Sequence, residues 1–145
     1  MIRVRKVIEI NHPQLQNVID AAKESFFNAH APYSEFRVGA AALTKNGIIV
    51  QGCNVENASY GLTVCAERNC LASAVVQGEK EFSFIVIYTE EERLTPPCGA
   101  CRQVIAEFFE HDAPIIAVNH KDKKQFWSID ELLPDAFTPK DLIKG

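Results

Sequence analysis

The sequence contains no apolar run approaching the roughly 20 residues that cross a membrane. Its basic start, "MIRVRK", is not followed by the uninterrupted apolar stretch of a signal peptide, because Glu9 and Asn11 interrupt it, so we expect no leader. Positive charge is not in excess: 15 Lys and Arg stand against 19 Asp and Glu, for a formal net charge of −4. A nucleic-acid surface needs clustered Lys and Arg, so this balance argues against nucleic-acid binding. The lack of a long apolar run argues against a membrane partner.

Internal repeats and low-complexity linkers are also missing. The 145 residues are most simply one domain, 1–145, which is long enough to bury a hydrophobic core without disulfide support. Apolar residues make up 47% and charged residues 23%, the balance of an ordinary globular protein. Five cysteines are an odd number, and without a secretory context they predict no disulfide framework. We therefore expect a protein of the reducing cytoplasm.

The hydrophobic pattern indicates an α/β fold. Apolar residues recur at helical spacing between residues 13 and 29, and an "NG" turn predicts a hairpin within residues 37–53. Strand-like residues at 1–10 alternate imperfectly and indicate an extra edge strand. Strands alternating with helices after the hairpin imply one sheet covered by helices on both faces. The other expected elements are a helix over 65–76, a strand over 82–89, a helix from Pro97, a strand over 114–120, a solvated turn at 121–124 and a short helix capped by Ser128 and Glu131.

The segment "TPPCGACRQVI" places Cys98 and Cys101 with two residues between them, directly after a double proline and ahead of a helical pattern. Such a pair is found in redox dithiols, in structural zinc sites and in catalytic metal sites. The redox interpretation expects the pair after an early strand in a thioredoxin-like setting, whereas this pair lies late in the chain. The choice among the three depends on what else the sequence offers.

A companion motif stands about 30 residues upstream, in "VCAERNC". Cys65 and Glu67, separated by one alanine, followed by Pro-Cys-x-x-Cys, reproduce the signature of zinc-dependent deaminases, with Cys where some of them carry His. A closed structural site would need a fourth ligand. Cys53 and Cys70 could be nominated, but Cys70 lies five residues along the helix of Cys65 and points away from its face. Three ligands, Cys65, Cys98 and Cys101, with one open position therefore fit better.

The chemistry explains these residue types. Helix N-termini stabilise the thiolates that bind zinc, and all three cysteines lie in first turns of predicted helices. Three thiolates outweigh the two charges of Zn²⁺, so a compensating cation is expected, and Arg68 and Arg102 are the candidates; for Arg68 we prefer this role to that of a solvated surface residue.

Glu67 is interpreted as the group that moves protons. It is not a metal ligand; it takes a proton from the activated water and delivers it to a ring nitrogen of the substrate. The alternative is an acidic residue favoured in the first turn of a helix by the macrodipole. The neighbouring cysteine and the distant Pro-Cys-x-x-Cys favour the catalytic interpretation.

Several blocks together resemble the cytidine deaminase family, in its small, homotetrameric, three-cysteine form: "APYSEFRVGAAAL", "GCNVENASYG", "CAER", "PCGACRQVI" and "ELLPDAF". The resemblance runs from about Ala31 to Leu142. It implies a three-layer α/β/α fold with a five-stranded mixed sheet, and one Zn²⁺ per chain. It further implies hydrolysis of cytidine and deoxycytidine to uridine and deoxyuridine in pyrimidine salvage, by a homotetramer whose active sites are shared between subunits.

The resemblance also implies roles for residues in those blocks. Phe36 corresponds to an aromatic packed on the pyrimidine ring, and Asn54 with Glu56 to a pair that binds the ribose hydroxyls. Tyr60 matches a tyrosine near the subunit contact. The backbone of Ala66 matches the donor to the base carbonyl, and Phe137 an aromatic that reaches a neighbouring subunit's pocket.

One departure lies near the expected reaction centre: Pro96 stands where the family usually has serine, so a carbonyl is kept but a side-chain hydroxyl is lost. Three other functions stay open. A blasticidin-type antibiotic deaminase shares the P-C-G-x-C-R-Q part of "PCGACRQVI", although "CAER" and "NVENASYG" favour the nucleoside enzyme. A nucleotide or nucleic-acid deaminase would need cations near the pocket, and a catalytically silent zinc-binding module would need no Glu67.

Overall fold

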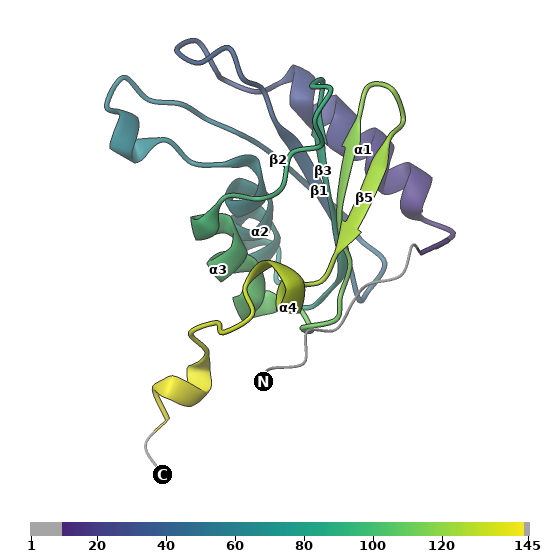
Figure 1. Ribbon diagram of the computed structural model, residues 1–145, viewed down its shortest axis with the longest axis vertical. Helices are drawn as coiled ribbons and strands as arrows, with labels where there is room; N and C mark the ends of the chain where they lie inside the picture. The colour runs from purple at the N-terminus through teal and green to yellow at the C-terminus, as the bar shows by residue number, and fades with distance from the viewer. Residues whose placement is uncertain (1–9, 144–145) are drawn as a thin grey trace.

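The computed structural model describes residues 10–143, and its centre is a five-stranded mixed sheet in the order β2-β1-β3-β4-β5 (Figure 1). β3 and β4 are parallel, and every other neighbouring pair is antiparallel. The expected five-stranded mixed sheet is thereby confirmed. The strands are β1 (Gly39–Thr44), β2 (Ile49–Cys53), β3 (Phe82–Thr89), β4 (Ile115–Asn119) and β5 (Lys124–Trp127).

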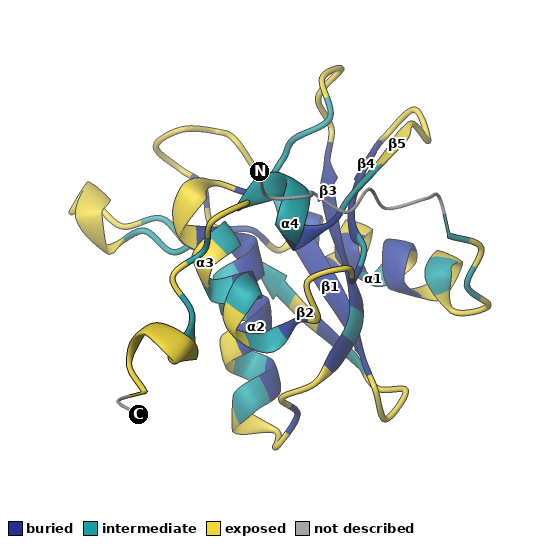
Figure 2. Cartoon of the chain, turned by 60° about the horizontal axis from the view of Figure 1, so that its bottom comes forward, coloured by how far each residue is buried: buried dark blue, intermediate teal, exposed yellow. Residues whose placement is uncertain are grey.

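Helices cover both faces of this sheet, as the hydrophobic pattern predicts. Side chains alternate across a strand, so neighbouring residues of β1 enter different cores: Ala41 packs with α1, and Ala42 packs with α2. Burial is concentrated in the strands and in the helix faces turned toward them (Figure 2). One face carries α1 (Leu15–Phe27), and the other carries α2 (Ala66–Val76), α3 (Gly99–Phe108) and the short α4 (Ile129–Leu132).

Two glycines let the helices approach the sheet closely. A Cβ at Gly39 would lie 1.9 Å from the carbonyl oxygen of Ala22 in α1. A Cβ at Gly52 would lie 2.3 Å from the backbone nitrogen of Cys70 in α2. Both distances are far below van der Waals contact, so only glycine fits at these positions. The close approach at Gly52 fixes the depth at which α2 lies on β2.

The predicted elements agree with the observed ones to within a few residues, with one omission. β5 was not expected: the turn predicted at 121–124 is present up to residue 123, and it leads into a strand that pairs antiparallel with β4. The Ser128–Glu131 capping box is confirmed at the start of α4. The edge strand expected at 1–10 falls almost wholly outside the described residues. None of the described helices has both the length and the apolar composition to cross a bilayer.

Candidate metal centre and active site

Three cysteine sulfurs converge where α2 and α3 begin. Cys65 is the N-cap of α2, Cys98 is the N-cap of α3, and Cys101 lies in the first turn of α3. The Sγ atoms of Cys65 and Cys98 are 3.7 Å apart, those of Cys98 and Cys101 are 3.4 Å apart, and all three lie within 4.8 Å of one another. In the described part of the chain, this is the group of side chains suited to holding a metal ion.

The donor set fits zinc. Tetrahedral ligands at Zn–S distances of about 2.3 Å lie about 3.8 Å from one another, close to the separations seen here. The N-termini of α2 and α3 both present their partial positive charge to the sulfurs, which favours thiolates. Cys70 takes no part, because its buried thiol donates to the carbonyl of Val50, and burial raises its pKa to about 12. Three protein ligands are the number that catalytic zinc sites use.

Arg68 lies against this group of sulfurs. Its guanidinium donates to Cys65 Sγ at 3.5 Å, and its Nε is buried without a hydrogen-bond partner in the described part of the chain. The pKa of Cys65 is lowered to about 5, chiefly by the hydrogen bond from Cys101 and further by Arg68. The pKa of Cys101 is raised, because its thiol donates to Cys65 and is buried. Without a metal ion, the three sulfurs therefore share protons through hydrogen bonds among themselves. The guanidinium of Arg68 provides one positive charge beside them.

Arg102, the other expected cation, is engaged elsewhere. Its Nε donates to the carbonyl of Pro97 at 2.8 Å, and its Nη1 donates to the carbonyl of Leu132 at 3.0 Å. The side chain therefore ties the residue before Cys98 to α4. Of the two arginines, Arg68 is therefore the one that donates to a sulfur.

Glu67 is buried in the first turn of α2, with 4% of its surface exposed. Burial raises the pKa of its carboxyl to about 7, and the nearby Cys65 contributes in the same direction. A cation among the sulfurs would act against this shift, since opposite charge favours the carboxylate. The structure thus places a carboxyl group able to accept and release protons beside the sulfurs, as general acid–base chemistry requires.

Cys65, Glu67 and Cys98 line a cavity of about 320 Å³. It is large enough for a small organic molecule, and its lining contains no Lys or Arg. Four of the residues expected to contact substrate are among those that line it. The lining residues are Ser34, Phe36, Val38, Asn54, Glu56, Thr63, Cys65, Ala66, Glu67, Ile87, Thr95, Pro96 and Cys98.

Two further expected residues lie outside this cavity. Tyr60 lines an adjoining hollow that shares Ser34, Glu56 and Thr63 with the first. Phe137 lines neither, and it is 57% exposed in the segment that follows α4. The backbone carbonyl of Phe137 accepts from Gln103 Nε2 at 2.8 Å, which holds this segment against α3.

The comparisons with known proteins agree with this site. Residues 12–117 match the family model described as the cytidine and deoxycytidylate deaminase zinc-binding region. The chain belongs to this deaminase family. The matched residues include all three clustered cysteines and Glu67, so the group of sulfurs falls within the region that the family model describes as zinc-binding.

Individual deaminases are similar over nearly their whole length. The cytidine deaminase of Halalkalibacterium halodurans is 44% identical over 88% of this chain and 96% of its own. A probable cytidine deaminase of Dictyostelium discoideum is 45% identical over 92% and 90%. The crystal structure of the Burkholderia pseudomallei cytidine deaminase has a TM-score of 0.81 and 43% identity, over 88% of this chain and all of that one. That of Mycobacterium tuberculosis has a TM-score of 0.75 and 35% identity, over 87% and 98%.

Within the deaminase site, Asn54 and Glu56 are held by a network that the sequence does not reveal. Asn54 Oδ1 accepts from the backbone of Val38 at 2.9 Å, and its Nδ2 donates to the carbonyl of Phe36 at 2.8 Å. Each polar atom of this amide keeps one further hydrogen bond to offer. Asn54 therefore fixes the loop before β1 that carries Phe36, while still facing the cavity.

Ser34 is a residue to which sequence analysis assigned no role. Its hydroxyl and backbone N–H both donate to the Glu56 carboxylate, and the Tyr33 N–H donates at 2.9 Å. The hydrogen bond from the Ser34 side chain is the main cause that lowers the Glu56 pKa. Ser34 Oγ also accepts from the Phe36 backbone at 3.0 Å. A single serine in a loop carries no motif of its own. Its position in "APYSEF", two residues before Phe36, is the one sequence feature that connects it with the site.

Proposed function

We propose that this chain is a zinc-dependent cytidine deaminase, which hydrolyses cytidine and deoxycytidine to uridine and deoxyuridine and releases ammonia. The observation that carries the proposal is the combination, at one cavity, of a three-sulfur group with the buried carboxyl of Glu67. The first serves to hold a metal, and the second serves to move protons. The similarity to named cytidine deaminases over 88% of the chain or more supports it.

When bound, the metal supplies Lewis acidity, which lowers the pKa of water so that it is nucleophilic near neutral pH. Cys65, Cys98 and Cys101 would hold the zinc ion, one per chain. Their three negative charges exceed its two positive charges, and the guanidinium of Arg68 beside Cys65 offsets the excess. The buried position of Arg68 Nε strengthens this effect, because charges interact more strongly away from bulk water.

Glu67 carries the protons of the reaction. It accepts a proton from the attacking water and delivers it to the ring nitrogen beside the amine-bearing carbon. The water oxygen forms a new bond to that carbon. Glu67 then moves the proton of the new hydroxyl group to the amine, the carbon–nitrogen bond breaks, and ammonia leaves as the carbonyl forms. The sum is one cytosine and one water converted to one uracil and one ammonia.

The remaining lining residues would select the substrate. Phe36 packs on the pyrimidine ring, the backbone N–H of Ala66 donates to the base carbonyl, and Asn54 with Glu56 binds the ribose hydroxyls. The lining offers no Lys or Arg to a phosphate, and the Glu56 carboxylate would repel one. A nucleoside is therefore favoured over deoxycytidylate, the other substrate named in the family's description.

The functional unit is proposed to be a homotetramer with shared active sites. Tyr60 and Leu62 are more than half exposed in the single chain, beside the cavity, and exposed apolar side chains of this kind mark contact surfaces. Phe137 is exposed as well, and it would reach the pocket of a neighbouring subunit. In a cell, we place the enzyme in the cytoplasm, in pyrimidine salvage.

Ultraviolet absorbance of cytidine incubated with the purified protein tests the activity directly, alongside ammonia release and zinc content. Turnover with about one zinc per chain is the expected result. Deoxycytidylate and a blasticidin-type antibiotic, assayed at the same concentration, should react far more slowly. Faster turnover of either competitor would replace cytidine with that substrate, and zinc without turnover of any of them would indicate a silent binding module.

The Glu67→Gln variant isolates the proton transfers from metal binding. It keeps the size of the side chain but cannot accept and release protons, so kcat should fall by at least about 10²–10⁴ while zinc content stays unchanged. Retained turnover in a zinc-loaded Glu67→Gln protein would exclude the role proposed for this carboxyl.

A further inference from the structure

The segment between β3 and α3 reaches the active site along an irregular path. It carries Thr95 and Pro96 into the cavity wall and ends at Cys98 in the group of sulfurs. In the described part of the chain, no backbone–backbone hydrogen bond involves residues 91–97. Side chains must therefore hold the course of this segment.

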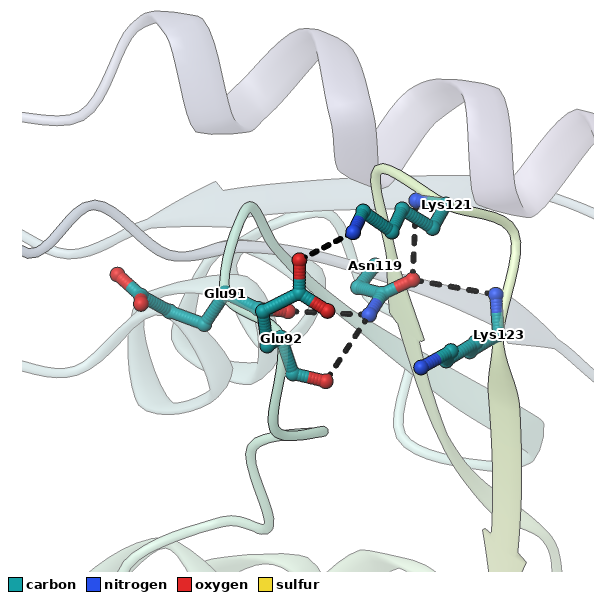
Figure 3. A network of polar contacts seen from close by, with 5 residues as sticks. All are labelled: Glu91, Glu92, Asn119, Lys121 and Lys123. Atoms are coloured by element: carbon teal, nitrogen blue, oxygen red, sulfur yellow. Dashed lines mark hydrogen bonds and ion pairs between the residues drawn. The ribbon is translucent and has the colours of Figure 1, made fainter.

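The largest of these contacts comes from Asn119, the last residue of β4, which is paired with Thr89 at the end of β3. Its side chain is 2% exposed and lies between two segments (Figure 3). Nδ2 donates to the carbonyl oxygens of Glu91 at 3.0 Å and Glu92 at 3.3 Å. Oδ1 accepts from the backbone of Lys121 at 3.0 Å and of Lys123 at 3.1 Å.

All the hydrogen-bonding capacity of this amide is used. A primary amide offers two N–H donors and a carbonyl oxygen that accepts twice, and each of the four finds a backbone partner. One side chain thus fastens the turn between β4 and β5 to the segment that leads to Cys98. The ion pair between Lys121 and Glu92 bridges the same two segments, but it is exposed and contributes little.

The rest of the segment is fixed at two more points. The hydroxyl oxygens of Thr89 and Thr95 lie 3.3 Å apart, and Arg102 Nε donates to the carbonyl of Pro97 at 2.8 Å. Pro96 and Pro97 restrict the backbone between these points, because each ring fixes φ. A shift of residues 91 and 92 is therefore transmitted toward Pro96 and Cys98 instead of being absorbed.

We propose that Asn119 is a positioning residue of the active site: by holding the carbonyls of Glu91 and Glu92, it sets where Cys98 and the Pro96 wall lie. It touches neither the sulfurs nor the substrate, and it acts through the 91–97 segment. The consequence for catalysis rests on the proposed deaminase function, whereas the consequences for the segment and for metal retention do not.

The Asn119→Asp variant cuts this link selectively. Aspartate keeps an oxygen for the N–H groups of Lys121 and Lys123, but it has no donor for the carbonyls of Glu91 and Glu92. NMR order parameters at the amides of residues 92–95 should fall from about 0.85 toward 0.6 or below, while those within β5 stay unchanged. Zinc should pass to a chelator about 10- to 100-fold faster, as when a group supporting a metal ligand is lost. The cobalt-loaded variant should show weakened thiolate-to-cobalt absorption.

Two controls separate positioning from loss of stability. Val118→Ala removes buried apolar volume one residue earlier in β4 and leaves the amide of Asn119 in place. It should lower the denaturation midpoint without changing the cobalt spectrum of the folded protein. Lys121→Met removes only the exposed ion pair and should behave as wild type. Equal loss of zinc in Val118→Ala and Asn119→Asp, or unchanged order parameters at 92–95 in Asn119→Asp, would overturn the proposal.

The wild-type protein provides a test that does not depend on a variant that folds. If Asn119 joins the two segments, the side-chain amide protons that it donates to Glu91 and Glu92 open together with the amides of Lys121 and Lys123, with exchange rates that respond equally to denaturant. Independent opening would refute the link. Failure of the wild type to deaminate cytidine would instead remove the proposed function, and the exchange and chelation measurements would still decide this inference.

Discussion

Arg68 donates a hydrogen bond from its guanidinium to the sulfur of Cys65, three residues earlier at the N-cap of α2. The contact connects the only basic residue of the "CAER" block to the group of sulfurs. Because α2 places both residues on one face, spacing alone brings the cation to the thiol. The guanidinium thus belongs to the electrostatics of the site.

Replacing Arg68 with glutamine should weaken zinc retention and catalysis together. Without the cation, three thiolates and one zinc ion carry an unbalanced negative charge, so zinc should be lost to a chelator about 10- to 100-fold more readily, and kcat/KM should fall by a similar factor. Zinc content after dialysis and cytidine turnover measure the two effects. Lys23→Gln, which removes an exposed charge from the opposite layer, should change neither. Undiminished retention in Arg68→Gln would contradict the charge-balancing role.

The sequence predicted the parts of the site that depend on local structure. Cys65 and Glu67 lie two residues apart, and Cys98 and Cys101 three apart, at starts of helices recognisable from their apolar spacing. Local geometry then turns each pair toward the cavity. The chemistry of the residue types indicated zinc, which the family model supports. It also indicated a proton carrier, and that role of Glu67 stays a prediction.

Contacts between segments remote in the sequence could not be predicted in this way. Ser34 supports Glu56 from 22 residues away, and Asn119 reaches back 28 residues to Glu91. β5 was missed because "KQFW" carries exposed Lys124 and Gln125, the residues of an edge strand that pairs on one side only. The role of Arg102 could not be seen either, since its acceptor at Leu132 lies 30 residues on.

Removing the Ser34 hydroxyl should alter the pH dependence of substrate binding. Hydrogen bonds from Ser34 hold the pKa of Glu56 below its ordinary value. The stabilisation they give is therefore present above the ordinary pKa and is lost as pH falls through the lower folded value. In Ser34→Ala the pKa rises toward the ordinary value, so the KM for cytidine should begin to rise at a higher pH on acidification.

Cytidine KM measured between pH 7 and pH 4 checks this expectation. At neutral pH the Ser34→Ala variant should raise KM by up to about tenfold, since Glu56 loses one charge-assisted hydrogen bond that orients it. Ser73→Ala is the matched control, because among the described residues the Ser73 hydroxyl bonds only to Gln77, on the same helix α2. Parallel pH profiles for wild type and Ser34→Ala would show that Ser34 does not set the ionisation of Glu56.

Gly52→Ala should destabilise the protein and displace the helix that carries Cys65 and Glu67. Its Cβ would lie 2.3 Å from the backbone nitrogen of Cys70, so α2 must move away from β2, at a cost of about 1–3 kcal/mol. Gly61→Ala provides the control, since nothing lies within 4 Å of its Cβ position. Urea denaturation and zinc content report the two effects. A fully stable Gly52→Ala protein would mean that the close approach of α2 to β2 is not required.

Removing the metal should expose the thiols that hold it. Of the described cysteines, Cys53 and Cys65 are half-buried, Cys98 is exposed, and Cys70 and Cys101 are buried. With zinc bound, a thiol reagent should label Cys53 alone, because metal-bound thiolates are protected and burial keeps Cys70 unreactive. Chelation should add fast labelling of Cys65 and Cys98, with Cys101 slower.

The Cys53→Ser variant removes the labelling of Cys53, so that only the metal-binding cysteines are followed, and mass spectrometry identifies each labelled site. If Cys98 in zinc-containing protein were labelled at the same rate before and after chelation, the metal would lie elsewhere. A disulfide between Cys98 and Cys101 in freshly purified protein would favour redox chemistry instead.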